Sequence, residues 1–307
     1  MASLPTATYH WQRLPIPMGQ DNTPQLWICT LQAPVAEVAG NKWLKLHSAI
    51  QQRKPGQGLL SFGGAFSNHL VALAAAGQHY HFPTIGLVRT EQLDMHNPTL
   101  RRCRELGMQL IALDRISYRQ QQQPEFLVRL KITYPEYLIL PEGGSDLAGA
   151  AGVGQLPLLQ TPDGDADLLC CATASGGTLA GLIQRYPEVR CLGLPVVKDA
   201  SLADRIKQCL PPTSCYQNWQ LAEANSAYGK VNAELVAFCC QLKQHYQLST
   251  EPIYTGKALQ LLSQLLQTGS LSGVKRIAFF HTGGLQGLHG LYYRRLLTEA
   301  QYRLLLS

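Results

Sequence analysis

The sequence has few charged residues and no long apolar run. Charged residues make up 15% of the 307 residues and hydrophobic residues 46%, a balance that argues against an intrinsically disordered chain. No apolar run is long enough to cross a bilayer, and the segment 1–15 has no apolar signal core. We therefore expect a compact cytoplasmic protein without a membrane segment, long enough to form two lobes.

The nine cysteines lack the spacing of a metal or redox site. The sequence contains no C-x-x-C and no His/Cys pattern of a zinc site, although two cysteine pairs are adjacent (Cys170-Cys171 and Cys239-Cys240). Several cysteines stand in apolar runs, where a thiol acts as a small hydrophobic group. We predict reduced cysteines and no bound metal.

A basic stripe with interleaved aromatic residues, as found in nucleic-acid binders, is also missing. The formal net charge of +6 comes from scattered residues. The densest basic group, Arg101, Arg102 and Arg104, is typical of the solvated face of a helix. We expect no nucleic-acid partner, while an anionic substrate or a phosphate group would suit the chain.

Short, continuous apolar runs alternate along the chain with stretches of helical character. Such runs are typical of parallel strands buried on both faces. The strands expected are 26–31, 58–62, 84–88, 109–113, 137–140, 168–172, 190–194 and 276–280, and the helices 68–79, 98–106, 122–134, 178–186, 232–246 and 256–266. This alternation predicts an α/β fold with doubly wound open sheets, and the glycine-rich segment 141–154 is a candidate boundary.

The segment Gly40-Asn41-Lys42-Trp43-Leu44-Lys45-Leu46 is the first candidate for chemistry. It places Lys42 at the start of an expected helix, behind a Gly-Asn turn. A lysine amine near apolar neighbours has its pKa lowered by desolvation and can condense with an aldehyde. We expect Lys45 to be an ordinary solvated lysine, because most lysines are.

Two glycine-rich loops each follow an expected strand and open an expected helix. The first is Gly63-Gly64 followed by Ser67-Asn68-His69, which has more polar groups than a helix cap needs. The spare groups could bind a carboxylate and a cofactor hydroxyl. The second is Ser175-Gly176-Gly177-Thr178, whose backbone N–H groups and hydroxyls could hold a phosphate. It matches neither the dinucleotide fingerprint nor the P-loop, which counts against a nucleotide-binding protein.

Two further loops lie near the carboxyl end of the chain. A buried strand is expected to end at His281-Thr282-Gly283-Gly284, so Thr282 can present its hydroxyl at the strand tip. The other loop, Glu251 to Lys257, places Tyr254 and Thr255 immediately before a helix. A tyrosine there could donate a proton or orient a substrate.

Together these segments resemble one family, the pyridoxal-phosphate (PLP) enzymes of the tryptophan-synthase-β-like fold. Within it they resemble the branch of 1-aminocyclopropane-1-carboxylate (ACC) deaminase and D-cysteine desulfhydrase, in order from about Gly40 to Gly290. The resemblance implies two doubly wound open-sheet lobes with the cofactor between them, the smaller (48–147) inserted into the larger (1–47 and 148–307). It also implies a small amino-acid substrate and, by analogy, a homodimer.

The resemblance also implies a role for each matching residue. Lys42 holds the cofactor aldehyde, Ser67 contacts the substrate carboxylate with Asn68 and His69 beside it, and Asn68 also contacts the cofactor 3-hydroxyl. Ser175, Gly176, Gly177 and Thr178 hold the phosphate, and Thr282 faces the pyridine nitrogen, with Thr255 as the other candidate hydroxyl. Tyr254 is the active-site tyrosine and Tyr228 a second family tyrosine, so that Lys42, Ser67, Tyr254 and Tyr228 form the implied catalytic set.

Thr255 and Thr282 bear on the substrate. ACC deaminases resemble Y-E-G-K and H-L-G-G at these places and D-cysteine desulfhydrases Y-[ST]-G-K and H-T-G-G, so this chain has the desulfhydrase pattern at both. A hydroxyl leaves the pyridine nitrogen less charged, which suffices for proton removal followed by loss of thiolate. The resemblance thus implies a lyase that converts D-cysteine to pyruvate, sulfide and ammonia.

Three other functions remain open. ACC deamination, or elimination from another small D-amino acid, would use the same site. A PLP-binding protein without turnover is suggested by Leu44, where the family has arginine, and by the segment 30–34, where it has a charged stretch. The third is a nucleotide-binding α/β protein. The absence of a dinucleotide fingerprint counts against it.

Overall fold

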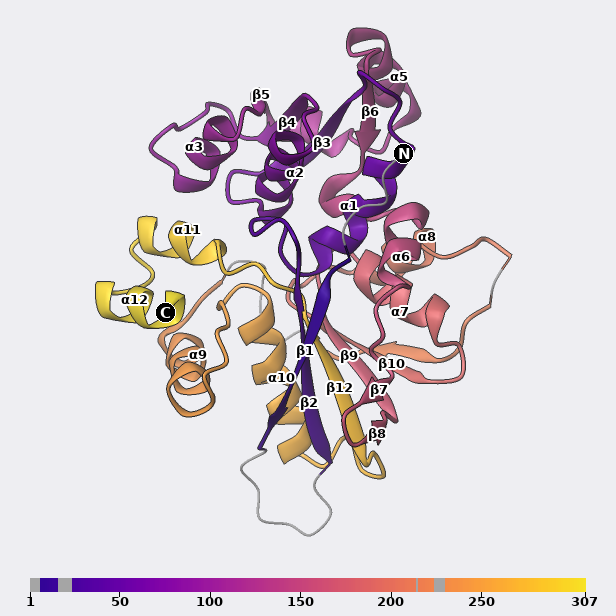
Figure 1. Cartoon of the computed structure of the whole chain (residues 1–307), viewed down its shortest axis with the longest axis vertical. Coiled ribbons are helices and arrows are strands. Elements are labelled where there is room, and N and C mark those ends of the chain that lie inside the picture. The colour runs from indigo at the N-terminus through magenta and orange to yellow at the C-terminus, as the bar shows by residue number, and fades with distance from the viewer. Residues whose placement is uncertain (1–5, 16–23, 214, 224–229) are drawn as a thin grey trace.

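The computed structural model describes residues 6–15, 24–213, 215–223 and 230–307. Two sheets form the framework, one above the other in Figure 1. The larger sheet has the order β1-β2-β12-β9-β10-β11, and every pair in it is parallel except β1 and β2. Its strands are β1 (Thr8–Leu14), β2 (Gln25–Gln32), β9 (Leu168–Thr173), β10 (Arg190–Pro195), β11 (Trp219–Leu221) and β12 (Arg276–His281).

The smaller sheet has the order β5-β4-β3-β6 and is parallel throughout. Its strands are β3 (Gly58–Gly64), β4 (Thr84–Arg89), β5 (Gln109–Leu113) and β6 (Tyr137–Leu140), and a separate hairpin joins β7 (Gln160–Thr161) to β8 (Gly164–Asp165). Helices α2 (Asn68–His79), α3 (Pro98–Glu105), α4 (Arg115–Arg119) and α5 (Pro124–Thr133) belong to this upper part of Figure 1.

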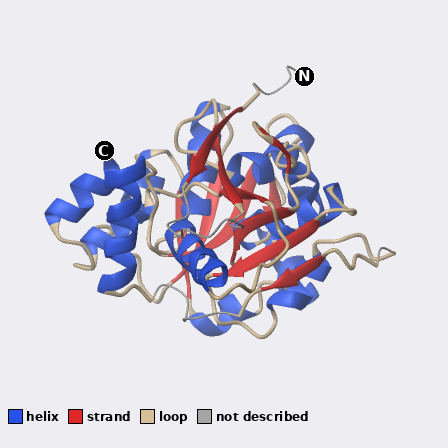
Figure 2. Cartoon of the chain, turned by 90° about the horizontal axis from the view of Figure 1, so that it is seen from below, coloured by secondary structure: helices blue, strands red, loops and turns tan. Residues whose placement is uncertain are grey.

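Helices cover both faces of the larger sheet, as Figure 2 shows from below. The helices around it are α1 (Asn41–Gln52), α6 (Leu147–Val153), α7 (Gly177–Arg185), α8 (Leu202–Gln208), α9 (Ala233–Tyr246), α10 (Thr255–Gln267), α11 (Gly287–Tyr293) and α12 (Glu299–Leu306), with a 3-10 turn at Glu142–Gly144. Along β12, Ala278 and Phe280 join the core that includes α1 and α7. Ile277 and Phe279 join the core on the α10 side. This alternation is what a sheet buried on both faces requires.

The prediction of an α/β fold with two doubly wound sheets is confirmed. All eight expected strands are present, with ends shifted by at most two residues, and the expected helices agree as closely. The structure adds β1, the hairpin, β11 and helices α4, α6, α8, α11 and α12, which the sequence did not predict.

We propose the division into a smaller lobe, 48–147, and a larger one. All four strands of the smaller sheet lie between residues 58 and 140, which supports it. The boundary at residue 48 falls inside α1, so this helix passes from one lobe to the other (Figure 1).

All nine cysteines are free. In the part of the chain that the structure describes, no helix is long and apolar enough to span a membrane. The described residues likewise contain no cluster of three or more His, Cys, Asp or Glu side chains that could hold a metal ion.

Candidate active site

The first turn of α1 is docked against the end of β12. Gly40 has a φ of 58°, and a Cβ there would lie 2.1 Å from the carbonyl oxygen of Thr282, so no side chain fits without a shift of the backbone. The N–H of Asn41 donates to the same carbonyl at 3.2 Å. Glycine at this position therefore brings the start of α1 onto the tip of β12, beside Thr282.

Lys42 lies in the first turn of α1 and lines a cavity of about 500 Å³. Its Nζ donates to Asn41 Oδ1 at 3.1 Å. Removal from water, and then the positive charge of Lys45, lower the pKa of the Lys42 amine to about 7. A large fraction of the amine is then unprotonated near neutral pH, as a nucleophile towards an aldehyde must be.

Lys45 is buried, so the expectation of a solvated surface lysine is wrong. Its side chain is only 3% exposed, and its Nζ donates to Ser145 Oγ at 2.9 Å and to the carbonyl of Gly143 at 3.4 Å. Burial lowers its pKa to about 8. The reason is position: Lys45 follows Lys42 by three residues and faces the same side of the helix, which is turned towards the loop before α6.

Ser67, Asn68 and His69 line the same cavity at the start of α2. Ser67 caps the helix, because its Oγ accepts from the N–H of Leu70 at 3.3 Å. Asn68 Nδ2 donates to the carbonyl of Gly284 at 3.4 Å, which links α2 to the loop after β12. Ser67 therefore caps α2 and also lines the cavity.

His69 is buried beside the two lysines. Its Nε2 lies 2.8 Å from Ser61 Oγ, and its Nδ1 has no hydrogen-bond partner. Burial, and then the charges of Lys42 and Lys45, hold the pKa of His69 well below its usual value, so the ring is neutral at physiological pH.

The loop between β9 and α7 forms another wall of the cavity. Ser175, Gly176 and Thr178 line it, and Gly176, with a φ of 91°, begins the helix without a side-chain cap. The first N–H groups of this nine-residue helix are therefore left for another acceptor. Gly177 does not line the cavity: a Cβ there would lie 2.9 Å from Ser145 Oγ, so glycine makes room for Ser145.

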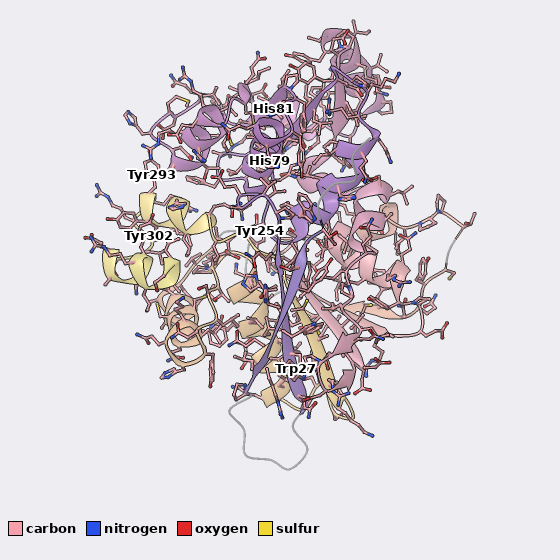
Figure 3. The ribbon with its side chains drawn as sticks, viewed as in Figure 1. Trp27, His79, His81, Tyr254, Tyr293 and Tyr302 are labelled. Atoms are coloured by element: carbon pink, nitrogen blue, oxygen red, sulfur yellow. The ribbon has the colours of Figure 1, made fainter. Side chains whose placement is uncertain are left out.

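Tyr254 and Thr282 complete the cavity wall from the large-sheet side. Figure 3 places Tyr254 centrally, below the helices of the small sheet. Thr255 is fully buried and is not part of the wall; its Oγ1 lies 3.5 Å from Thr282 Oγ1. Tyr228 lies outside the described residues.

Glu251 organises this part of the cavity wall, although the sequence did not indicate such a role. Its buried carboxyl group accepts hydrogen bonds from the N–H groups of Ile253 (2.7 Å), Tyr254 (3.0 Å) and Thr255 (2.8 Å). Burial raises its pKa to about 8. A carboxylate just before a helix is a capping signal, and the E-P-I-Y segment contains it.

These groups fit PLP. The cavity offers three groups, each on a different wall: an amine with a lowered pKa, an uncapped helix N-terminus and a hydroxyl. Its volume is in the range of small-molecule sites. The family model described as "Pyridoxal-phosphate dependent enzyme" matches residues 35–283, most of the chain. The chain belongs to the pyridoxal-phosphate-dependent enzyme family.

The similar proteins cover between 82% and 96% of the chain. The chain is 26% identical over 271 residues to a "Putative 1-aminocyclopropane-1-carboxylate deaminase" of Pyrococcus abyssi, with 82% of each chain covered. It is 25% identical over 287 residues to a "D-cysteine desulfhydrase" of Klebsiella pneumoniae, covering 82% of this chain and 84% of that one. A solved "ACC deaminase homologue" superposes with a TM-score of 0.75 at 21% identity, over 96% of this chain and 95% of the other.

Proposed function

We propose that this protein is a PLP-dependent lyase that acts on a small amino acid, with D-cysteine as the first candidate. D-cysteine and water would give pyruvate, sulfide and ammonia. The observation that carries the proposal is that the Lys42 amine, with its pKa near 7, shares one cavity with the uncapped N-terminus of α7. When bound, PLP supplies an aldehyde for a lysine amine and a ring that accepts electrons from the substrate Cα.

The residues that would hold the cofactor come from three parts of the chain. Lys42 would hold the aldehyde, and the α7 N-terminus with Ser175, Gly176 and Thr178, which line the cavity, would hold the phosphate. Asn68 would contact the 3-hydroxyl, and Thr282 would face the pyridine nitrogen. The placement of Thr282 on the cavity wall, with Thr255 buried behind it, favours Thr282 over Thr255 for that contact.

The Lys42 amine, once the substrate amine has displaced it, is also the group we propose to take the proton from the substrate Cα. An amine with a pKa near 7 can both accept and release a proton at neutral pH, which suits a general base. Ser67, with Asn68 and His69, would hold the substrate carboxylate at the N-terminus of α2. Tyr254, and Tyr228 outside the described residues, are the proposed tyrosines near the leaving group. Closure of the two lobes would exclude water from the cavity.

D-cysteine is placed first because of Thr255 and Thr282, which follow the desulfhydrase pattern, and the name of the Klebsiella relative supports it. ACC deamination at the same site is the second candidate, supported by the name of the Pyrococcus abyssi relative. The double variant T255E/T282L separates them, because it installs the deaminase pattern. It should raise the ratio of 2-oxobutanoate formed from ACC to pyruvate formed from D-cysteine.

A PLP-binding protein without turnover has less support. Leu44, one of the departures behind that reading, is buried in the core and does not line the cavity. The segment 30–34 does not line it either. Both departures thus lie away from the groups proposed to act on the substrate.

The test is the visible absorption spectrum of the purified protein with PLP, titrated with D-cysteine while pyruvate is followed. A cofactor band that shifts as pyruvate appears supports the proposal. The K42A variant should lose the band and the product, and near-normal turnover in K42A would contradict the assignment of Lys42. A band that shifts without pyruvate would move the search to ACC and other D-amino acids. The homodimer and the cytoplasmic location remain proposals, which size-exclusion chromatography and cell fractionation would test.

A further inference from the structure

The side chain of Asn41 lies between Lys42 and the loop that begins α7. Its Oδ1 accepts from Lys42 Nζ at 3.1 Å, and its Nδ2 donates to Thr178 Oγ1 at 2.9 Å. The residue is only 8% exposed and lines the cavity. Its backbone N–H is bound to the carbonyl of Thr282. One amide group therefore connects the candidate aldehyde-binding amine with a hydroxyl of the candidate phosphate loop.

Hydrogen-bond chemistry fixes the orientation of this amide. Oδ1 accepts from an Nζ–H of Lys42, which a neutral amine as well as an ammonium can donate, and this leaves the donor Nδ2 for Thr178. The Thr178 oxygen accepts from Asn41 and keeps its own proton for a second acceptor. Thr178 is the second residue of α7 and lines the cavity, so an anion at the helix N-terminus is in reach of that proton.

We propose that Asn41 is a positioning residue that couples an anion bound at the N-terminus of α7 to the reactivity of the Lys42 amine. This rests on the proposed function, which places the phosphate and the aldehyde at these two sites. An anion that accepts the Thr178 proton orders the hydroxyl. The ordered hydroxyl holds the Asn41 amide, and Oδ1 then holds the Lys42 amine in one direction. By linkage, an aldehyde held at Lys42 tightens binding of the anion by the same factor.

The coupling can be measured without turnover by splitting the cofactor into two probes. Pyridine-4-carboxaldehyde provides the aldehyde and ring, and inorganic phosphate provides the anion. The cofactor-free protein is mixed with the aldehyde at fixed pH, with and without phosphate, and adducts are trapped with borohydride. Peptide mass spectrometry then gives the fraction of Lys42 modified. In the wild type we expect phosphate to raise this fraction at low aldehyde concentration by about fivefold, the lower end of typical coupling between two sites.

Variants at the two ends of the connection test whether Asn41 carries the effect. N41A should trap aldehyde equally with and without phosphate. T178V, which removes the hydroxyl but leaves the helix amides, should lose the enhancement as well, and T178S should restore it. Q52A, an exposed residue of the same helix, is the matched control and should behave as the wild type. If Asn41 has only a structural role, N41A should trap less aldehyde both with and without phosphate. T178V should then keep the phosphate enhancement of the wild type.

An equal phosphate enhancement in N41A and the wild type would overturn the proposal. So would a wild type that traps the aldehyde at Lys42 but shows no phosphate effect, and in that case the proposed function would stand. If the wild type traps nothing at Lys42 and gives no absorption band with PLP, the proposed function fails and this proposal with it.

Discussion

Thr255 Oγ1 lies 3.5 Å from Thr282 Oγ1, and of the two side chains only that of Thr282 is part of the cavity wall. The resemblance that introduced these residues treats them as a pair of markers for the substrate. The structure separates them by depth: Thr282 can touch a bound molecule, whereas Thr255 is fully buried behind it and can act only through its neighbour.

Replacement of each threonine by valine tests this difference in depth. T282V removes a hydroxyl from the cavity wall at nearly constant volume. We expect kcat/KM for the amino-acid substrate to fall about tenfold, since one lost hydrogen bond is worth about 1 kcal/mol or somewhat more. T255V should keep most of the activity, because its hydroxyl does not reach the cavity. Equal losses in the two variants would show that depth does not decide their contribution.

The sequence predicted the buried strands well, because strands covered on both faces are continuous apolar runs. It missed β1, whose residues from Thr8 to Leu14 mix polar and aromatic side chains at the edge of the sheet. It also gave no helix in the segment 141–154, where α6 forms. Its small residues permit a close contact: a Cβ on Gly152 would lie 2.2 Å from the carbonyl of Leu44 in α1. Local composition does not reveal such a partner.

The candidate site was predictable only in part, for a related reason. Motif spacing indicated Lys42, Ser67 and Thr178, and the structure brings all three to one cavity. The groups that hold these residues, such as Asn41 and Ser145, are ordinary polar residues until the fold places them within 3 Å of a partner. The burial of Lys45 was also not predictable from the sequence, because it depends on the packing of α1 against the loop before α6.

Removal of the Lys45 charge should raise the pKa of Lys42. The positive charge of Lys45 disfavours the ammonium form of Lys42. In the K45M variant this repulsion is gone, and only desolvation lowers the pKa of Lys42. Asp146, Cys171 and Cys209 act on Lys45, whereas Lys45 is the charged neighbour that acts on Lys42, and His69 of α2 beside the two lysines is neutral. The pH at which borohydride trapping of PLP at Lys42 is half-maximal should therefore move upward from near 7. An unchanged or lower midpoint in folded K45M would contradict the electrostatic contribution.

Glu251 should make stability depend on pH in a way that glutamine does not. Burial raises its folded-state pKa from 4.5 to about 8, so between these pH values the folded state binds more protons than the unfolded state. The contribution of this group is fully present below pH 4.5 and is lost as pH rises towards 8. E251Q cannot lose a proton. The melting temperature of E251Q minus that of the wild type should therefore increase from pH 5 to pH 8. A constant difference would mean that Glu251 does not titrate in this range.

Gly40 and Gly56 offer a matched pair for testing the contact between α1 and β12. Both have positive φ, 58° and 79°, but a Cβ at Gly56 meets nothing within 4 Å, whereas one at Gly40 would overlap the carbonyl of Thr282. G56A should therefore cost only the left-handed backbone penalty of about 1 kcal/mol. G40A adds the displacement of α1 and should cost about 3 kcal/mol or more.

Urea unfolding of the two variants measures these costs, and trapping of PLP at Lys42 measures the effect on the site. In G40A the displaced helix carries Asn41 and Lys42 away from Thr282, so trapping should fall even under conditions where the variant remains folded. In G56A the turn lies away from the cavity wall, and trapping should equal that of the wild type. If both glycines tolerate alanine equally in stability and trapping, the close contact of Gly40 with Thr282 is not what positions Lys42.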